Sequence, residues 1–328
     1  MRFAVIGSNY IVDRFLAAGV LCPDFIPVAL YSRTRQRAQE YGEIQGIPLR
    51  FTQLGDLARC DSIEAVYIAS PNYCHAEQAI QMLKAGKHVL CEKPVAVNSR
   101  ELDQMLQAAR ESGCALVEAM RPTFSPVMAA IKSALPRIGK LRRATISYCQ
   151  YSGRYDNFKK GIIENAFRPE LANGALMDIG VYCVGILSHL FGRPKGLQAT
   201  CTKLHNGVDA QGSILAGYGD FLAELRYSKI VESSLPCEIQ GEAGSILFYG
   251  VNDPARPEII WRDGRREALP CEHRYQGNLN MAYEISAFQS LAENRAHYPQ
   301  IEARLRIEME IMDEARRQTG ILFPNDHA

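Results

Sequence analysis

Lys93 stands in the triplet Glu92-Lys93-Pro94, directly after the apolar run His88–Cys91. The run has the length of a buried strand, and Pro94 restricts the residue before it to extended backbone angles. Open α/β sheets bind their ligands where parallel strands end. A lysine held there could hydrogen-bond a substrate hydroxyl or carbonyl and stabilise the oxyanion that develops during hydride transfer. The triplet alone leaves open the alternative of a lysine that caps a strand in water.

Asp178 and Tyr182 are four residues apart in the apolar stretch Ala175–Leu190, which predicts a largely buried helix. This spacing places both side chains on one face of an α-helix. A buried carboxylate needs a partner, and Lys93 is the predicted one. Tyr182 would then exchange the proton of a substrate hydroxyl. Taken alone, Asp178 also fits a carboxylate favoured by the helix dipole, and Tyr182 also fits a core tyrosine.

The first turn of the chain lies between the apolar run Phe3–Gly7 and the helical pattern Tyr10–Leu21. A strand, turn and helix in this order can hold the phosphates of a dinucleotide. Only the first of the three expected glycines is present, so an ordinary βα turn is an equal alternative. We expect Asn9 to replace the middle glycine by adopting left-handed angles, and Val12 to space the helix from the strand. The predicted cofactor contacts here are Gly7, Ser8, Asn9, Tyr10 and Ile11.

The second apolar run, Ile26–Tyr31, leads into hydroxyl and arginine side chains and no carboxylate before Glu40. An NAD site usually has Asp or Glu here for the ribose 2′-hydroxyl, whereas hydroxyls and a guanidinium suit a 2′-phosphate. The pattern favours NADP over NAD, with a solvated helix start as the alternative. The predicted phosphate contacts are Ser32, Arg33, Thr34 and Arg37.

The first third of the chain alternates short apolar runs with helical patterns. Further strands are predicted at Ala65–Ser70 and Ala115–Glu118. Glu118 could face a ligand cleft, with a strand end in water as the alternative. Helices are predicted at Arg35–Ile44, Tyr73–Ala85 and Ser99–Glu111. Continuous apolar strands that alternate with helices indicate a parallel sheet covered on both faces. We therefore predict an α/β fold with a doubly wound Rossmann domain at residues 1–121.

After Met120 strands dominate, with turn signals such as those at 217–220 and 241–244. The pattern predicts an α+β domain with a large open antiparallel sheet at residues 122–328. Its predicted strands are Leu141–Tyr151, Leu197–Lys203, Ser213–Tyr218, Phe221–Tyr227, Leu235–Gln240, Ser245–Phe248 and Glu258–Trp261. Its predicted helices are Val127–Leu135, Ala175–Leu190, Met281–Glu293 and Ala303–Thr319.

The composition argues against several other classes of protein. The net charge is +1, so no basic excess favours nucleic acid. Ten cysteines without a Cys-x-x-Cys pair or a secretory leader predict reduced thiols in a cytoplasmic protein. No histidine stands at metal-ligand spacing, and no apolar run was expected to approach the roughly 20 residues of a membrane span.

Two motifs carry a resemblance to a known family. The first motif consists of Ala69–His75 together with Glu92-Lys93-Pro94. The second motif is Asn173–Tyr182. It fits the pattern Gly-Gly-x-x-x-Asp-x-Gly-x-His/Tyr, with Asn173 in place of the first glycine. The sequence resembles the glucose–fructose oxidoreductase and inositol 2-dehydrogenase (Gfo/Idh/MocA) family from Arg2 to the helix that includes Glu310–Glu314. With Tyr182 in place of histidine, and with Glu164–Pro169, it resembles the dimeric dihydrodiol dehydrogenase and NADP-linked sugar dehydrogenase branch.

The resemblance implies roles for particular residues. Lys93 and Tyr182 would manage the substrate proton, and Asp178 would orient Lys93. His75 is grouped with the cofactor segment, although we expect it to bond neighbouring backbone and not to catalyse. The cofactor group implied near the nicotinamide ribose is Ser70, Pro71, Asn72, His75, Glu92 and Lys93. The candidates for substrate contact are Arg154, Tyr155, Phe158 and Arg168.

The sequence therefore predicts an NADP-preferring oxidoreductase that acts on a sugar or a cyclic polyol or ketone. The resemblance also implies a homodimer, formed through an open sheet face that we expect to be apolar. One alternative is a catalytically inactive protein of the same fold that senses NAD(P) or binds partners. Another is redox-neutral use of tightly held NAD, as in the glycosidases of the family.

Overall fold

The computed structural model describes residues 1–272 and 274–326, and the chain divides into two units. The first unit is Met1–Ala119 with Tyr275–Leu305, and the second is Met120–Arg274 with Arg306–Ala328. The first change of unit lies within two residues of the predicted boundary at 121. The prediction placed everything after residue 121 in the second domain, whereas the structure assigns Tyr275–Leu305 to the first unit.

The first unit is built on a six-stranded sheet in which every paired strand is parallel. The strand order is β3-β2-β1-β4-β5-β6, the order of a dinucleotide-binding Rossmann sheet. The predicted doubly wound sheet is therefore confirmed. The strands are β1 (Arg2–Ile6), β2 (Ile26–Tyr31), β3 (Leu49–Phe51), β4 (Ala65–Ile68), β5 (His88–Glu92) and β6 (Leu116–Ala119).

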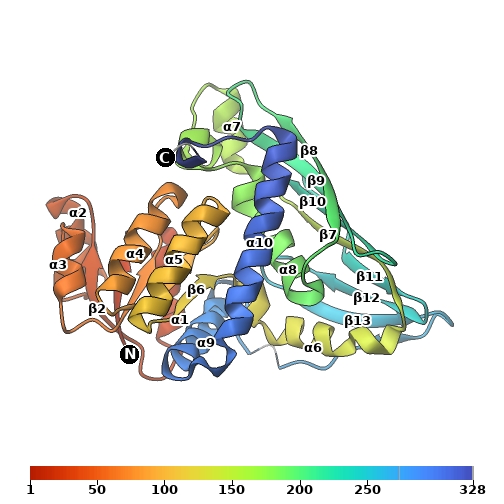
Figure 1. The fold of residues 1–328 in the computed structure, drawn as a ribbon, viewed down its shortest axis with the longest axis horizontal. Helices are drawn as coiled ribbons and strands as arrows, with labels where there is room; N and C mark the ends of the chain where they lie inside the picture. The colour runs from red at the N-terminus through yellow and green to blue at the C-terminus, as the bar shows by residue number, and fades with distance from the viewer. Residues whose placement is uncertain (273, 327–328) are drawn as a thin grey trace. The chain divides into compact units, whose positions relative to one another are not determined.

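Helices connect these strands and cover the sheet. Figure 1 shows α4 and α5 side by side, and their packing buries the apolar stripe of each helix. The sequence pattern missed β3 and α3, because a three-residue strand and a six-residue helix are too short for a periodic signal. The helices of this unit are α1 (Tyr10–Gly19), α2 (Arg35–Ile44), α3 (Leu54–Arg59), α4 (His75–Lys84), α5 (Ser99–Ser112) and α9 (Met281–Glu293).

Helix α9 joins the first unit from late in the chain. It packs on α1, and the ring centroid of its Phe288 lies 5.8 Å from that of Phe3 in β1. The Sγ of Cys22 also donates to the backbone oxygen of Ala282 at 3.4 Å. These contacts explain why Tyr275–Leu305 belongs to the first unit. Nothing local in the sequence could reveal this.

The second unit is built on an eight-stranded sheet of order β14-β13-β12-β11-β7-β10-β9-β8. Most neighbours are antiparallel as predicted, but β7 and β10 pair in parallel, so the sheet is mixed. The strands are β7 (Leu141–Cys149), β8 (Gly196–Lys203), β9 (Asp209–Gly217), β10 (Leu222–Ser228), β11 (Cys237–Gly241), β12 (Gly244–Tyr249), β13 (Ala255–Trp261) and β14 (Arg266–Ala268).

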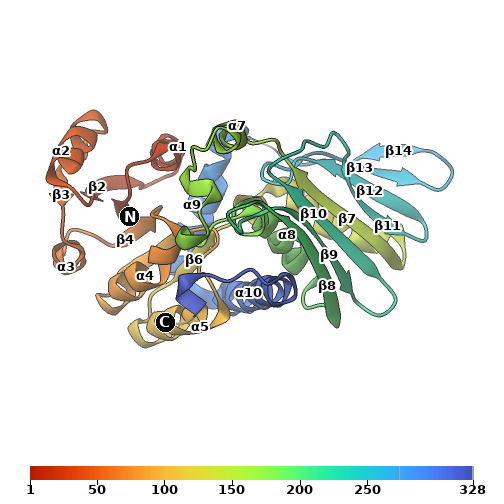
Figure 2. The same cartoon turned by 90° about the horizontal axis from the view of Figure 1, so that it is seen from above.

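One face of this sheet packs on α8 (Val181–Phe191), as Figure 2 shows, and neither view places a described helix on the other face. Along β10, buried Ala223, Leu225 and Tyr227 alternate with the more exposed Leu222, Glu224 and Arg226. The outer face is thus partly polar, and the expectation of an apolar face was wrong. The other helices of the unit are α6 (Pro126–Ala134), α7 (Gly153–Lys159) and most of α10 (Tyr298–Thr319).

Pro169–Phe191 is long and apolar enough to cross a membrane by length and composition, which the sequence analysis had not expected. Its most apolar window is 83% buried inside the protein. A helix that is apolar all round and lies in the protein interior is a core helix. Its burial accounts for the composition without a membrane.

Candidate active site

The turn after β1 is tight because of Gly7. Its φ is +123°, and a Cβ there would lie 2.8 Å from the backbone oxygen of Ala69. Asn9 does not adopt the left-handed angles that we expected; its φ is −104° and it caps α1. Its Oδ1 accepts from the amides of Ile11 and Val12, and its Nδ2 donates to the Ala69 oxygen at 2.9 Å. Asn9 therefore ties the turn to β4, and it accepts from the amide of Ile11, one of the predicted cofactor contacts.

Val12 is buried, and its Cγ2 lies 3.6 Å from the position of a Gly7 Cβ. It fills the space between strand and helix where the usual motif has a third glycine. Tyr10 begins α1 and is 56% exposed. The turn at the end of β1, next to the switch point between β1 and β4, has the position that a pyrophosphate requires.

The predicted 2′-phosphate residues follow β2, and three of them have structural roles. Thr34 accepts from the amide of Arg37 and caps α2, and Ser32 is buried at the strand end. Arg37 donates from Nε to Ser8 Oγ at 2.9 Å and from Nη2 to Ser8 O at 2.6 Å. Arg33 is exposed and makes no hydrogen bond or ion pair to the described residues. Of the four residues, Arg33 is thus the cation available to a phosphate.

His75 braces two segments that the sequence analysis assigned to the cofactor. Its Nδ1 lies 2.9 Å from Pro94 O and its Nε2 lies 2.9 Å from Ser70 O. Burial lowers the pKa of His75, against the opposing effect of the two carbonyls. A neutral ring donates through only one nitrogen, so one carbonyl holds the hydrogen bond at a time. The expected backbone bonding is present, and it links the end of β4 to the residue after Lys93.

The end of β5 is held by a hydrogen bond from the side chain of Tyr67, which lies in the neighbouring strand β4. The Tyr67 hydroxyl donates to Glu92 Oε1, and its ring stacks on Phe15 with centroids 3.7 Å apart. The Lys93 amide donates to Glu92 Oε2 at 3.3 Å, and the Lys93–Pro94 peptide bond is cis. Before Pro71 and the turn Asn72–Cys74, Ser70 Oγ donates to Gln78 at 2.7 Å. These contacts fix the segments of Ser70 and Lys93 within one unit.

Glu118 does not face a cleft, and that hypothesis was wrong. Its side chain is fully buried, and its Oε1 accepts from the amide of Val95 at 3.0 Å. Its Oε2 lies 3.3 Å from Nη1 of Arg304, which is itself 6% exposed. Glu118 is therefore a buried structural carboxylate that holds the chain just after Lys93-Pro94.

Asp178 lies in a π-helical turn, Leu176–Gly180, that leads into α8. The sequence analysis assumed an unbroken α-helix, and the π turn changes the angular relation between Asp178 and Tyr182. Such turns are frequent at functional sites. Asp178 Oδ2 accepts from Nζ of Lys229 at 2.7 Å within the second unit. The pairing of Asp178 with Lys93, which belongs to the first unit, stays a prediction.

Tyr182 is 5% exposed and lies beside a cation of its own unit. Arg121, in the turn Arg121–Phe124, donates from Nη2 to the Tyr182 oxygen at 3.0 Å. The ring of Tyr148 meets Tyr182 edge-on with centroids 5.8 Å apart. The phenol oxygen thus accepts a charge-assisted hydrogen bond, which fixes its position.

The candidate substrate contacts separate into two kinds. Phe158 is 4% exposed and packs in a core cluster with Ala166 and Phe167, with Tyr155 against it, so Phe158 cannot contact a substrate without unpacking. The exposed Arg154 and Arg168 lie near carboxylates of the same segment, 3.4 Å from Glu164 and 3.9 Å from Glu170. The hypothesis for Phe158 was wrong, and the hypotheses for the arginines stay predictions.

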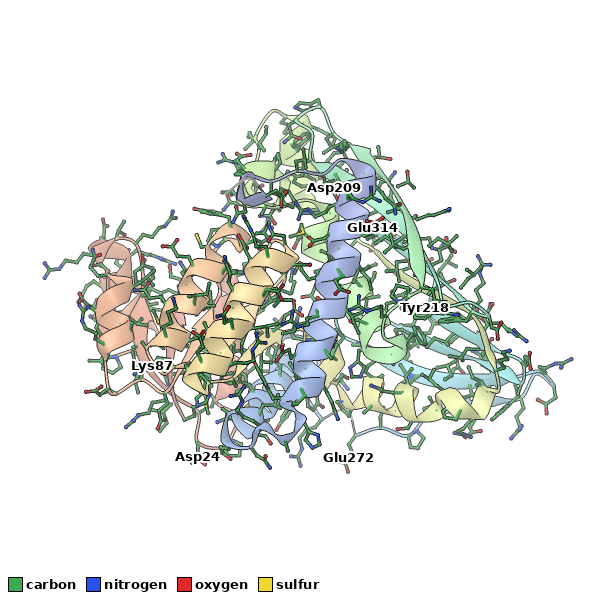
Figure 3. The ribbon with its side chains drawn as sticks, viewed as in Figure 1. Asp24, Lys87, Asp209, Tyr218, Glu272 and Glu314 are labelled. Carbon is green, nitrogen blue, oxygen red and sulfur yellow. The ribbon has the colours of Figure 1, made fainter. Side chains whose placement is uncertain are left out.

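Asp209 begins β9 and is 1% exposed (Figure 3). Its Oδ2 accepts from the amide of Leu176 at 2.7 Å, which places a carboxylate at the start of the helix that carries Asp178. A Cβ at Gly174, whose φ is +156°, would lie 1.9 Å from Asp209 Oδ1. The glycine of the second motif is therefore needed for this contact. Burial raises the pKa of Asp209 to about 6.

We expect Asp209→Asn to gain stability relative to wild type as the pH rises. Unfolded aspartate titrates near 3.9, so stabilisation linked to the protonated carboxyl is complete below that pH and is lost as the pH rises through about 6. A shift of about two units corresponds to about 3 kcal/mol at most. Thermal unfolding at pH 5 and pH 8 tests this, with exposed Asp61→Asn as the control. A difference between variant and wild type that stays constant with pH would contradict the assignment.

Lys229, Arg121 and Asp209 were not singled out from the sequence. Lys229 follows an alternating strand pattern as a lone lysine, which looks like the solvated end of a strand. Arg121 follows the last strand of the first unit in the same way. Only the pairing of these strands with the helix motif shows the relation, so no local signal could have found them. Among the described residues no group of His, Cys, Asp and Glu could hold a metal ion, and all ten cysteines are free.

Comparison with known proteins supports the family suggested by the motifs. Residues 1–120 match the oxidoreductase family with NAD-binding Rossmann fold (GFO_IDH_MocA), and residues 131–247 match the GFO/IDH/MocA C-terminal domain. The chain is 45% identical over the full length of both chains to scyllo-inositol 2-dehydrogenase (NADP(+)) IolU of Bacillus subtilis. It is 28% identical to human trans-1,2-dihydrobenzene-1,2-diol dehydrogenase over 99% of each chain.

Solved structures show the same fold. KijD10, a 3-ketoreductase from Actinomadura kijaniata in complex with NADP, matches with a TM-score of 0.80 at 23% identity, over 98% of this chain and 99% of that chain. Both family domains, the full-length relatives and the strand order agree. The chain belongs to the GFO/IDH/MocA family of oxidoreductases.

Proposed function

We propose that the chain is an NADP(H)-dependent dehydrogenase that moves hydride to or from a carbinol carbon of an inositol or a related cyclic polyol. The observation that carries this proposal is the 45% identity, over the whole of both chains, with a scyllo-inositol 2-dehydrogenase (NADP(+)). The first unit fits such a cofactor, because the tight turn at Gly7 ends β1 beside the switch point and Arg33 offers a cation after β2. When bound, the nicotinamide supplies the hydride chemistry.

We assign the proton chemistry to Lys93 and Tyr182. The Lys93 ammonium would stabilise the substrate oxygen while negative charge develops on it. In oxidation the carbinol O–H proton would pass to the Tyr182 oxygen, and in reduction the phenol would return it. The hydrogen bond from Arg121 holds the Tyr182 oxygen in a defined position for this transfer. Asp178 would act by orienting Lys93, as the family motif implies.

Titration of the nucleotide-free protein with NADPH and, separately, NADH tests the cofactor assignment. We expect micromolar binding of NADPH and much weaker binding of NADH, followed by turnover of inositols and related polyols. Tight binding of NADH with weak binding of NADPH would overturn the choice of cofactor but not the proposal that the protein is a dehydrogenase. Binding of neither would favour the alternative of a regulatory protein of this fold. Nucleotide that co-purifies without net turnover would favour redox-neutral use of the cofactor.

Arg33→Ala is expected to weaken NADPH binding about 10- to 100-fold and to leave NADH binding within about twofold. A charge-assisted contact to phosphate contributes about 1.5–3 kcal/mol, and NADH lacks the 2′-phosphate. Calorimetric titration of both cofactors measures the effect, so NADH is an internal control. Arg59→Ala, an exposed arginine of the same unit paired with Asp56, should change neither affinity. Equal losses for the two cofactors would place Arg33 away from the 2′-phosphate.

We further propose that two copies associate through the outer face of the eight-stranded sheet. Exposed Leu215 and Leu222 lie on β9 and β10 with the charged Glu224 and Arg226, a mixture that suits an interface more than a bare apolar face would. Light scattering should then give twice the mass of one chain, and the mass of a single chain would oppose it. We also propose a cytoplasmic location, as expected for reduced thiols.

A further inference from the structure

Lys229 is a buried lysine directly behind the second family motif. It follows β10, and its side chain is 3% exposed. Its Nζ lies 2.7 Å from Asp178 Oδ2, donates to Ala166 O at 2.8 Å, and lies 4.6 Å from the centroid of the Phe167 ring. Its backbone is fixed as well, because its amide donates to Ala210 O and its carbonyl accepts from Ser152. The ammonium therefore has one defined position in the second unit.

A buried ammonium is costly unless charge and hydrogen bonds compensate it. Asp178 supplies the opposite charge. Its side chain is 30% exposed, so the buried Lys229 pairs with a carboxylate that solvent can reach. The buried Asp209 lies close enough for the Lys229 charge to oppose the rise in its pKa. The Lys229 charge thus acts on two carboxylates near the start of this helix, and it contacts Asp178 directly.

We propose that Lys229 is a positioning residue for Asp178. The ammonium holds one oxygen of the carboxylate, which sets the plane of the group and the direction of its other oxygen. A functional side chain acts more precisely when contacts of this kind fix its geometry, and Asp178 lies in the π-helical turn of the second family motif. Lys229 touches neither substrate nor cofactor in this proposal and acts on kcat only through Asp178. The inference rests on the proposed role of Asp178.

A double-mutant cycle of Lys229→Met and Asp178→Asn tests it. We expect Asp178→Asn to lower kcat about 100-fold and Lys229→Met to lower it about 10-fold, with the Kd of NADPH within twofold of wild type in both. Because Lys229 acts through Asp178, the double variant should have the kcat of Asp178→Asn alone, within about twofold. A merely structural role would lower the thermal midpoint without this loss of additivity. Multiplicative losses in the double variant, or a wild-type kcat for Lys229→Met, would overturn the proposal.

Two further variants separate folding from positioning. Lys229→Gln keeps a hydrogen-bond donor for Ala166 O without the charge, so a reduced kcat at a near-native thermal midpoint supports the proposal even if Lys229→Met folds poorly. Lys132→Met is the matched control, because Lys132 of the same unit also donates to a backbone carbonyl, His189 O, at 2.9 Å. Its kcat should equal wild type. A wild-type kcat for Asp178→Asn would instead reject the catalytic role of Asp178, and with it the basis of the inference.

Discussion

Lys93→Met is expected to lower kcat for polyol oxidation about 100- to 1,000-fold, while the Kd of NADPH changes less than about fivefold. Removing one preorganised donor from a developing oxyanion costs a factor of this size. Methionine keeps the length and apolar stem of lysine, so the loss reports the ammonium group. The braces around the segment stay in place, since His75 binds Pro94 O and Glu118 binds the Val95 amide through backbone atoms that the variant retains.

The matched control for this variant is Lys87→Met. Lys87 is also in the first unit, is 7% exposed, and donates from Nζ to Cys60 O at 2.9 Å (Figure 3). It lies before β5 and Lys93 after it, so both lysines flank one strand. Lys87→Met should lower the thermal midpoint and leave kcat near wild type. A kcat for Lys93→Met within threefold of wild type would remove Lys93 from the mechanism.

Glu118→Ala is expected to lower the free energy of unfolding by about 3–5 kcal/mol, the largest loss of stability that we predict. The substitution removes the acceptor of the Val95 amide and the carboxylate beside the buried Arg304. Removal of one partner from a buried ion pair costs an amount of this order, because the remaining buried charge loses a contact that offsets its desolvation. For a unit of this size, the midpoint should fall by roughly 6–20 °C in thermal unfolding.

Glu118→Gln and the pair Glu118→Gln/Arg304→Met test the cause of this loss. Glutamine can still accept from Val95 but lacks the charge, so it should lie between wild type and alanine. The double variant removes both charges and should be more stable than Glu118→Ala. Equal midpoints for Glu118→Ala and wild type would show that the contact contributes nothing.

Long periodic elements were predictable from the sequence, and elements fixed by distant partners were not. Arg35–Ile44 and Met281–Glu293 have the predicted bounds, because their apolar positions repeat with helical spacing. The parallel pairing of β7 with β10 was missed, because nothing local in either strand states which strand lies beside it. For the same reason nothing local in α9 states that it packs on α1, although its bounds were predicted correctly.

In the candidate site, too, the residues marked by local motifs were predictable and their distant partners were not. Motifs located Lys93, Asp178 and Tyr182, but their partners within each unit come from segments far along the chain. Asn9 was identified correctly as the unusual residue of the first turn, yet for the wrong reason. Its side chain satisfies helix amides and the β4 carbonyl, and this needs no left-handed backbone. The residue type of Asn9 indicated an unusual role in the turn. The role became clear only from the backbone oxygen at the end of β4, to which Asn9 donates.

The return of the chain to the first unit affects how the protein folds during its synthesis on the ribosome. The Rossmann sheet is complete at Ala119, but α9, which covers Phe3, is made only after Arg274. At 5–20 residues per second, about 8–30 s separate the two events. During that interval Phe288 is not yet available to pack on Phe3, so we expect this aromatic surface to favour aggregation. A recombinant fragment that stops near residue 121 would lack α9, so we expect it to be less soluble than the full chain.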